Sequence, residues 1–393
     1  MPSDEPLHLA VALDGAGFHP AAWRDASARP RELFGAPYWV SLARTAERGL
    51  LDFLTIEDSF GLQGSRRAGP DDRTDQVRGR LDAVLIASLM APLTERIGLV
   101  PTANTTHTEP FHVASAIATL DYVSQGRAGW RPQVSSQPAE AAHIGRRSFA
   151  EREAGLVDGL FEEANDAVEV VRRLWDSWED DAVIRDVASG RFVDRDKLHY
   201  IEFEGRFFNV KGPSIVPRPP QGQPLVVALA HSEVPIEFAA RSADVVLVTP
   251  ADAAEVPQWV AQVRAAERTV GRAGDRLRIF GEIVVFLDDD ADAAAARKER
   301  LDTFLGKTYR SDAPVFTGTP ARLAAQLVAW QDLGLDGFRL RPGVIGHDLD
   351  AIVDGVVPAL QGLGAFRSAY DAGPLRARLG LGRPQSRYVE VSR

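Results

Sequence analysis

The side chains best suited to chemistry in this 393-residue sequence stand just after short apolar runs. They combine carboxylate, amide, hydroxyl, guanidinium and imidazole groups, and they are His19, Asp58, Asn104, His107, Arg131, Ser135, Ser136, His231 and Ser232. Aromatic residues such as Phe18, Phe60 and Trp130 stand beside them. A site that mixes aromatic surface with a few polar groups suits a planar ligand that has polar edges and an anionic tail.

Motifs for several other chemistries are missing. The chain has no cysteine, which excludes Cys-based zinc sites, iron–sulfur clusters and thiol nucleophiles. Its eight histidines have no metal-ligand spacing, so we predict no metal site. Residues 304–308 end like a phosphate-binding loop, but Leu301 stands where that loop needs glycine. Residues 14–18 begin like a dinucleotide fingerprint, but Pro20 stands at the third glycine position.

The apolar runs alternate with helical patterns, which is typical of α/β proteins. We expect eight strands, near residues 7, 51, 96, 128, 225, 245, 278 and 336. Eight β/α units predict a (β/α)8 TIM barrel, in which functional groups gather where the strands end. The alternative is a doubly wound sheet, which would normally carry a glycine-rich phosphate turn that is missing here.

The length of the chain allows one barrel with insertions in its strand-to-helix loops, because such barrels need about 250 residues. We therefore expect a single domain over residues 1–393. The alternating pattern is interrupted in four stretches, which we expect to be insertions at about 59–80, 137–159, 180–222 and 288–316. Residues from about 367 to 393 are expected to form a C-terminal extension.

Composition limits the partners that the protein is expected to have. With 45 basic and 55 acidic residues the net charge is −10, and no basic stripe indicates a nucleic-acid partner. No apolar run approaches the roughly 18 residues that cross a membrane. Residues 1–12 carry acids but no Lys or Arg, unlike a signal peptide. We expect a soluble cytoplasmic protein with no nucleic-acid and no membrane partner.

Several long strings make the sequence resemble a known family. They include TANTTHTEPFH at 102–112, DYVSQGRAGW at 121–130, LWDSWEDDA at 174–182 and PPQGQP at 219–224, with further stretches at 318–338 and 375–388. Through them the chain resembles the bacterial luciferase-like monooxygenases. The branch is that of the nitrilotriacetate, dibenzothiophene-sulfone and long-chain alkane monooxygenases, and the strings extend over nearly the whole chain.

The resemblance implies a TIM barrel that binds reduced FMN at the C-terminal ends of its strands. It implies that a separate flavin reductase supplies the reduced FMN. With O₂, a flavin C4a-peroxide would then oxygenate a small organic substrate. Such chemistry needs a dry pocket with a few fixed hydrogen-bond donors. The resemblance also implies a homodimer or a homotetramer.

Three residues acquire roles near the flavin ring from this resemblance, and a fourth is a candidate for the substrate side. Asp58 matches the acid that follows the second strand, and Asn104 takes the small polar position under the ring. His107 takes a position that is usually Tyr, and we predict that it is a donor or acid–base group near the flavin C4a region. His19 is a second catalytic candidate, expected to face the substrate.

The resemblance gives four further residues positions in the cofactor site. Ser135 and Ser136 stand where the family has Thr-Ser, while His231 and Ser232 stand near the phosphate loop.

Three departures from the family pattern allow more than one prediction for the cofactor. Arg131 replaces the asparagine of the family's Gly-Trp-Asn, and Leu229 stands where glycine lets the backbone approach a phosphate. Residues 160–161, Leu and Phe, replace an Arg-Tyr pair. Arg131 or His231 would supply compensating charge for FMN. The alternatives are a hydride-transfer enzyme that uses the deazaflavin coenzyme, and a barrel without cofactor that has a binding role.

Overall fold

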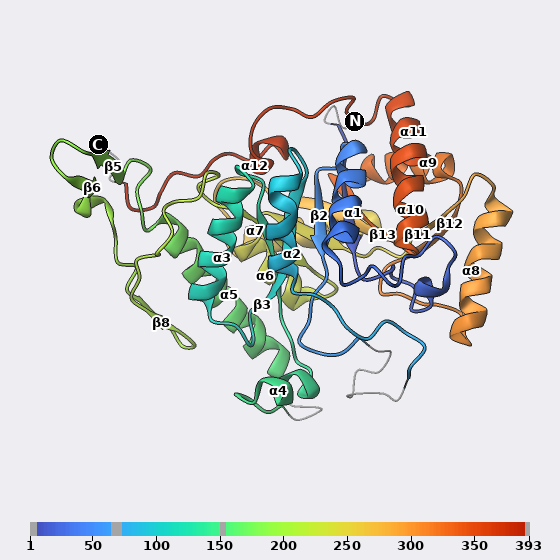
Figure 1. Ribbon diagram of the computed structural model, residues 1–393, viewed down its shortest axis with the longest axis horizontal. Helices are drawn as coiled ribbons and strands as arrows, with labels where there is room; N and C mark the ends of the chain where they lie inside the picture. The colour runs from blue at the N-terminus through green and yellow to red at the C-terminus, as the bar shows by residue number, and fades with distance from the viewer. Residues whose placement is uncertain (1–5, 64–72, 150–154, 390–393) are drawn as a thin grey trace.

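The computed structural model describes residues 6–63, 73–149 and 155–389 of the chain. In chain order its barrel strands are β1 (His8–Leu13), β2 (Phe53–Ile56), β3 (Gly98–Asn104), β4 (Gly129–Gln133), β9 (Leu225–Leu229), β10 (Val245–Val248), β11 (Arg278–Leu287) and β13 (Gly337–Pro342). All neighbours pair in parallel, and the pairings β10–β11 and β13–β1 close the ring. Figure 1 shows helices such as α2 and α3 on the outside of these strands. The structure confirms the expected TIM barrel and its eight expected strands.

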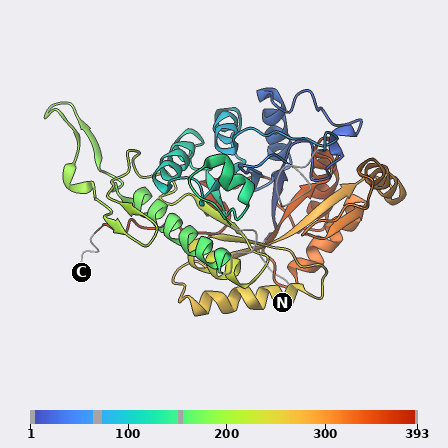
Figure 2. The ribbon, with the colours of Figure 1, turned by 90° about the horizontal axis from the view of Figure 1, so that it is seen from below.

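Helices surround the barrel, as the ribbon seen from below shows (Figure 2). They are α1 (Ala36–Arg48), α2 (Ala83–Met90), α3 (Pro110–Val123), α5 (Leu156–Asp176), α6 (Glu233–Ser242), α7 (Val256–Thr269), α8 (Ala291–Leu305), α9 (Pro320–Gln331), α10 (Ile345–Ala351) and α11 (Val357–Gly362). Local signals fix several ends. Thr319 caps α9 through the N–H of Arg322 and Pro320 follows, while Asp290 caps α8.

One end of the barrel interior is apolar and closed. Inward residues such as Phe53, Val100 and Phe280 form a buried cluster there. The C-terminal segment with α12 (Leu375–Arg378) adds Leu375 and Leu379 to this cluster, so the segment covers the end at which the strands begin. A ligand that enters the barrel interior must therefore do so where the strands end, which we call the mouth.

The connections carry further elements. Short α4 (Pro138–Ile144) follows β4, and β12 (Val315–Gly318) pairs with the last residues of β11. Between α5 and β9, the hairpins β5 (Val183–Asp186) with β6 (Arg191–Val193), and β7 (Phe203–Glu204) with β8 (Asn209–Val210), project to one side (Figures 1 and 2).

Parts of the expected insertions and of the C-terminal extension, at 64–72, 150–154 and 390–393, lie outside the described residues. In the described part of the chain, no helix is long and apolar enough to span a bilayer.

Candidate active site

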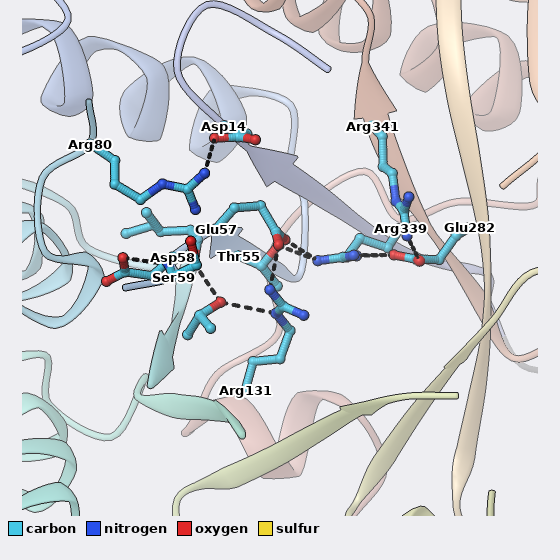
Figure 3. Close-up of polar contacts among 12 residues, drawn as sticks. Asp14, Thr55, Glu57, Asp58, Ser59, Arg80, Arg131, Glu282, Arg339 and Arg341 are labelled. Atoms are coloured by element: carbon cyan, nitrogen blue, oxygen red, sulfur yellow. Dashed lines mark hydrogen bonds and ion pairs between the residues drawn. The ribbon is translucent and has the colours of Figure 1, made fainter. Parts of the chain in front are cut away.

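Beneath the mouth, the barrel interior is crossed by paired charges that we call the ionic layer. Its members come from strands and strand-flanking segments far apart in the sequence, and they are Glu57, Arg131, Glu282, Asp312, Arg339 and Arg341. Strand residues alternate between the helices and the interior, so the polar residues at inward positions meet across the barrel. Figure 3 shows this row of side chains from Arg131 to Arg341.

The contacts of the ionic layer are continuous. Arg131 pairs with Glu57 and donates from Nε to the Thr102 hydroxyl at 3.0 Å. Arg339 donates to Glu57 at 2.8 Å and also pairs with Glu282. Glu282 pairs in turn with Arg341, so each charge has an opposite neighbour.

This pairing decides the electrostatics of the interior. Burial alone would raise the pKa of Glu57, but the guanidinium groups of Arg131 and Arg339 lower it to about 2. Three arginines face three acidic side chains, so the formal charges of the layer balance and it adds no net positive charge to the mouth. Arg131 is only 4% exposed and is committed to Glu57, so it does not offer a free cation to a ligand.

Above Arg131 lies a second group of side chains, which we call the open sector because its polar atoms lack partners. Among the described residues, the buried atoms without a hydrogen bond include Asn104 Nδ2, both ring nitrogens of His107, Gln133 Oε1 and Glu140 Oε2. Asn104 and Gln133 are register partners on β3 and β4, two residues beyond the pair Thr102 and Arg131. Buried polar groups are nearly always hydrogen-bonded, so this cluster indicates a ligand that completes it.

The turn after β3 prepares two members of the open sector. Asn104 accepts the N–H groups of Thr106 and His107 through Oδ1, at 2.8 and 2.9 Å, which leaves Nδ2 free. The His107 ring lies between Phe60 and Phe149, with centroids 6.2 and 6.1 Å away. Burial lowers the pKa of His107 and nearby Arg147 lowers it further, so its imidazole is neutral near pH 7.

Asp58 and Ser135 hold the loops around the open sector. Asp58 accepts backbone N–H groups from Ala83 at 3.0 Å and Ser59 at 2.7 Å, so it ties the loop after β2 to the start of α2. Burial raises the pKa of Asp58. The Ser135 N–H donates to the Thr106 hydroxyl at 3.0 Å and joins the loops after β3 and β4, and half-buried Ser136 follows it.

His19 lies apart from the open sector. Its ring is buried, with Nε2 3.1 Å from Asp302 of α8 and Nδ1 accepting the N–H of Ala21 at 3.1 Å. Both ring nitrogens are therefore engaged, and neither is free to face a substrate. The contacts show His19 fastening the loop after β1 to α8.

A cavity of about 670 Å³ opens at the side of the mouth opposite the open sector. It is lined by Phe18, His231, Thr249, Tyr309, Arg310, Ser311, Asp312 and Arg341. His231 follows β9 and lies against Thr249 and Asp312. Ser232 is the exposed N-cap residue of α6, and its side chain makes no capping bond. Leu229 packs inside the barrel against the apolar cluster.

The sequence reasoning missed several residues of this region, namely Gln133, Glu140, Thr249, Glu282, Asp312 and Arg339. A signal was present for two of them, because Glu282 and Arg339 interrupt strands that are otherwise buried and apolar. In the described part of the chain, no cluster of three or more His, Asp or Glu residues could hold a metal ion.

Comparisons with known proteins identify the family of the chain. The luciferase-like monooxygenase family matches residues 16–337. The chain is 30% identical to N-acetyl-S-(2-succino)cysteine monooxygenase of Bacillus subtilis (strain 168), over 98% of both chains. It is also 30% identical to nitrilotriacetate monooxygenase component A of Aminobacter aminovorans, over 100% of both. The solved structure of a riboflavin lyase with modified FMN and riboflavin has a TM-score of 0.84 and 25% identity, and the match covers 97% of each chain. The resemblance found in the sequence is confirmed, and the chain belongs to the luciferase-like monooxygenase family.

Proposed function

We propose that this protein is a flavin-dependent monooxygenase that uses reduced FMN and O₂ to oxygenate a small organic substrate. The observation that carries the proposal is the pair of unpartnered atoms Asn104 Nδ2 and Gln133 Oε1 on adjacent strands. The pyrimidine edge of a flavin has carbonyl acceptors beside an N–H donor. A free amide donor next to a free amide acceptor therefore fits that edge. The riboflavin lyase of the same fold holds a modified FMN, which supports this choice.

The residues of the open sector have separate tasks in this proposal. FMN, when bound, supplies the electrons with which O₂ is activated. Asn104 and Gln133 orient the ring edge, and Asp58 holds the loop beside it. Neutral His107 takes up or releases a proton at a ring nitrogen. Phe60 and Phe149 flank the imidazole and exclude water from it.

The remaining cofactor contacts belong to the same proposal. We assign the FMN phosphate to Ser232 at the N-terminus of α6, where backbone N–H groups attract an anion. Ser135 and Ser136 lie on the loop after β4 and are assigned to the ribityl chain. Arg131 supports the ring position from the ionic layer.

A partner reductase follows from the relatives. Nitrilotriacetate monooxygenase component A is named as one component of a system. We propose that this chain likewise receives reduced FMN from a separate flavin reductase, and that both work in the cytoplasm.

We also propose that the chain forms a homodimer or a homotetramer. The projecting hairpin of β5 and β6 exposes apolar side chains, with Val187 93% and Phe192 64% exposed, and exposed apolar surface favours association. Light scattering on the purified protein measures the oligomeric state directly.

The deazaflavin coenzyme is the second candidate, because the proposed phosphate position has few groups that would bind an anion. Glu233 follows Ser232 in the first turn of α6, and a carboxylate there opposes a phosphate. A deazaflavin enzyme would transfer hydride and would not use O₂.

The reaction of the reduced cofactor with O₂ tests the proposal. The protein is mixed anaerobically with reduced FMN, then rapidly mixed with oxygenated buffer, and flavin absorbance is followed. We expect re-oxidation with a time course distinct from that of free FMN, because the mouth binds the ring and limits water. A time course identical to free FMN at saturating protein concentration contradicts the proposal.

A further inference from the structure

The cavity opposite the open sector contains an ordered set of proton-carrying groups. His231 Nδ1 lies 3.2 Å from the Thr249 hydroxyl, and His231 Nε2 lies 3.3 Å from Asp312 Oδ2. All three residues line the cavity of about 670 Å³. They come from the ends of β9 and β10 and from the segment before β12, so only the folded barrel brings them together.

His231 forms a hydrogen bond with Thr249 and an ion-pair contact with Asp312, and the chemistry of these partners sets which ring nitrogen carries the proton. A carboxylate only accepts, so the proton of neutral His231 belongs on Nε2, toward Asp312. Nδ1 is then an acceptor and receives the hydroxyl hydrogen of Thr249. The lone pairs of the Thr249 oxygen are left for a group in the cavity. A hydroxyl, a base and an orienting acid in this order form an activated proton relay.

Asp312 is itself held in place. It accepts from Arg341 Nη1 at 2.7 Å and from the Ser311 hydroxyl at 2.9 Å. Arg341 is anchored in turn on buried Glu282 of the ionic layer. Arg341 thus links the relay to the buried ionic layer. Burial lowers the pKa of His231, Asp312 and Glu282 raise it, and Arg341 and Arg339 lower it, so that its pKa lies below the ordinary value.

We propose that Thr249, His231 and Asp312 form a proton relay that removes the proton of a weakly acidic hydroxyl on a flat substrate bound in this cavity. This proposal rests on the proposed function in one respect, because it assigns the cavity to the substrate that the monooxygenase would oxygenate. The hydroxyl proton moves to the Thr249 oxygen while the Thr249 proton moves to His231 Nδ1. No electrons are exchanged, and the products are an oxyanion and an imidazolium paired with Asp312. Because 41% of the His231 side chain is exposed, the extra proton then leaves to water.

The walls of the cavity define the substrate class. Phe18 and Tyr309 supply two aromatic rings, and Phe18 stacks at 5.5 Å on the guanidinium of Arg341. Aromatic surfaces favour flat apolar bodies, and the relay requires a hydroxyl on that body. A phenol combines both features, whereas an alkane offers nothing to Thr249.

Binding of 4-nitrophenol, whose phenolate is yellow and whose phenol is colourless, tests the relay without any flavin. The full chain is titrated with this probe at a pH below the pKa that the probe has in water. We expect wild-type protein to bind it with a raised phenolate-to-phenol ratio. Thr249→Val and His231→Gln should lower that ratio in the bound probe roughly tenfold, which is about 1.4 kcal/mol. Asp312→Asn should lower it as well.

Two controls keep the outcome clear. Thr249→Ser retains a hydroxyl and should retain the raised ratio. His199→Gln removes a histidine that pairs with Glu179 outside the mouth, and should leave the ratio unchanged. No binding of 4-nitrophenol to wild-type protein, or an equal ratio in Thr249→Val, overturns the relay. Neither result tests the proposed use of FMN, because the experiment contains no flavin.

Discussion

Asn104 illustrates how a single side chain both builds and completes the site. Its Oδ1 folds the turn that carries His107, and its Nδ2 remains unpartnered at the mouth. Its place after a strand and the family resemblance made it a candidate from sequence, and that assignment remains a prediction. The same reasoning missed Gln133, because nothing in the sequence marks it as the register partner of Asn104. It also expected His19 to face the substrate, whereas the ring is bonded to Asp302 and to the Ala21 N–H. The sequence could not show the bond to Asp302, because that residue lies on a helix far away in the chain.

The free amide donor of Asn104 should contribute to FMN affinity. Asn104→Asp keeps the acceptor that folds the turn and removes Nδ2. We expect the dissociation constant for reduced FMN to rise roughly tenfold, about 1.4 kcal/mol, while the melting temperature stays close to wild type. Anaerobic fluorescence titration measures the affinity. Unchanged affinity in a folded variant would remove Asn104 from the cofactor site.

His107 should matter for the reaction more than for binding. Its neutral imidazole has no partner among the described residues, so it is free to carry a proton near the cofactor. His107→Ala should slow the protein-bound reaction of reduced FMN with O₂ by roughly 100-fold, with similar FMN affinity. His143→Ala is the matched control, because His143 is exposed on α4 and contacts only the Phe60 carbonyl in this region. Equal time courses for both variants would leave His107 without the predicted role.

At the scale of elements, the sequences of the barrel strands carry two signals, which are apolar runs and charged residues inside some of those runs. Only the apolar runs were used to predict the fold. These runs predicted eight strands correctly. The charged residues inside two of those runs, Glu282 and Arg339, predict a polar barrel interior, but their pairing depends on which strands become neighbours. β11 and β13 are adjacent, with Glu282 opposite Arg339, although about fifty residues of helix and loop separate the two strands.

The ionic layer should contribute strongly to stability because its members are buried. Glu282 is fully buried and pairs with Arg339 and Arg341. Glu282→Gln leaves two buried guanidinium groups poorly paired and should lower the free energy of unfolding by about 3–5 kcal/mol. Urea denaturation followed by fluorescence measures the change. Asp354→Asn is the control, because its pair with Arg48 is exposed and should contribute less than about 1 kcal/mol.

Asp121 at the end of α3 should make stability depend on pH. Burial raises its pKa to about 6, although Gln221 and the Ala128 N–H donate to it. A carboxyl with a raised folded pKa binds protons more tightly when folded, so its contribution is present below about pH 4 and is lost as pH rises through 6. The loss is about 3 kcal/mol for a shift of about two units. Urea midpoints between pH 4 and pH 7 should show this fall in wild type and a flatter profile in Asp121→Asn.

At the scale of the whole molecule, one end of the barrel is sealed and the other carries the candidate site. The sequence predicted the fold class and the mouth, since strand count and strand-end residues are local properties. It did not show that the C-terminal segment returns to cover the other end, because that contact joins residues near 380 to strands from the whole chain.

The covering segment should be needed for the stability of the barrel. Leu379 is fully buried in the apolar cluster. Leu379→Ala should cost about 2–5 kcal/mol through lost burial and the cavity that remains. Leu363→Ala, at a position that is 59% exposed, should change stability little. A small effect of Leu379→Ala in the same thermal and urea measurements would mean that the segment does not hold the barrel closed.

Anaerobic titration of the wild-type protein with reduced FMN and with the reduced deazaflavin coenzyme tests the central claim most directly. The claim is that the open sector above the ionic layer is the binding site of reduced FMN. We predict saturable binding of reduced FMN, tighter than that of the deazaflavin and weakened by Asn104→Asp. No saturable binding of reduced FMN, or a preference for the deazaflavin, would contradict the account.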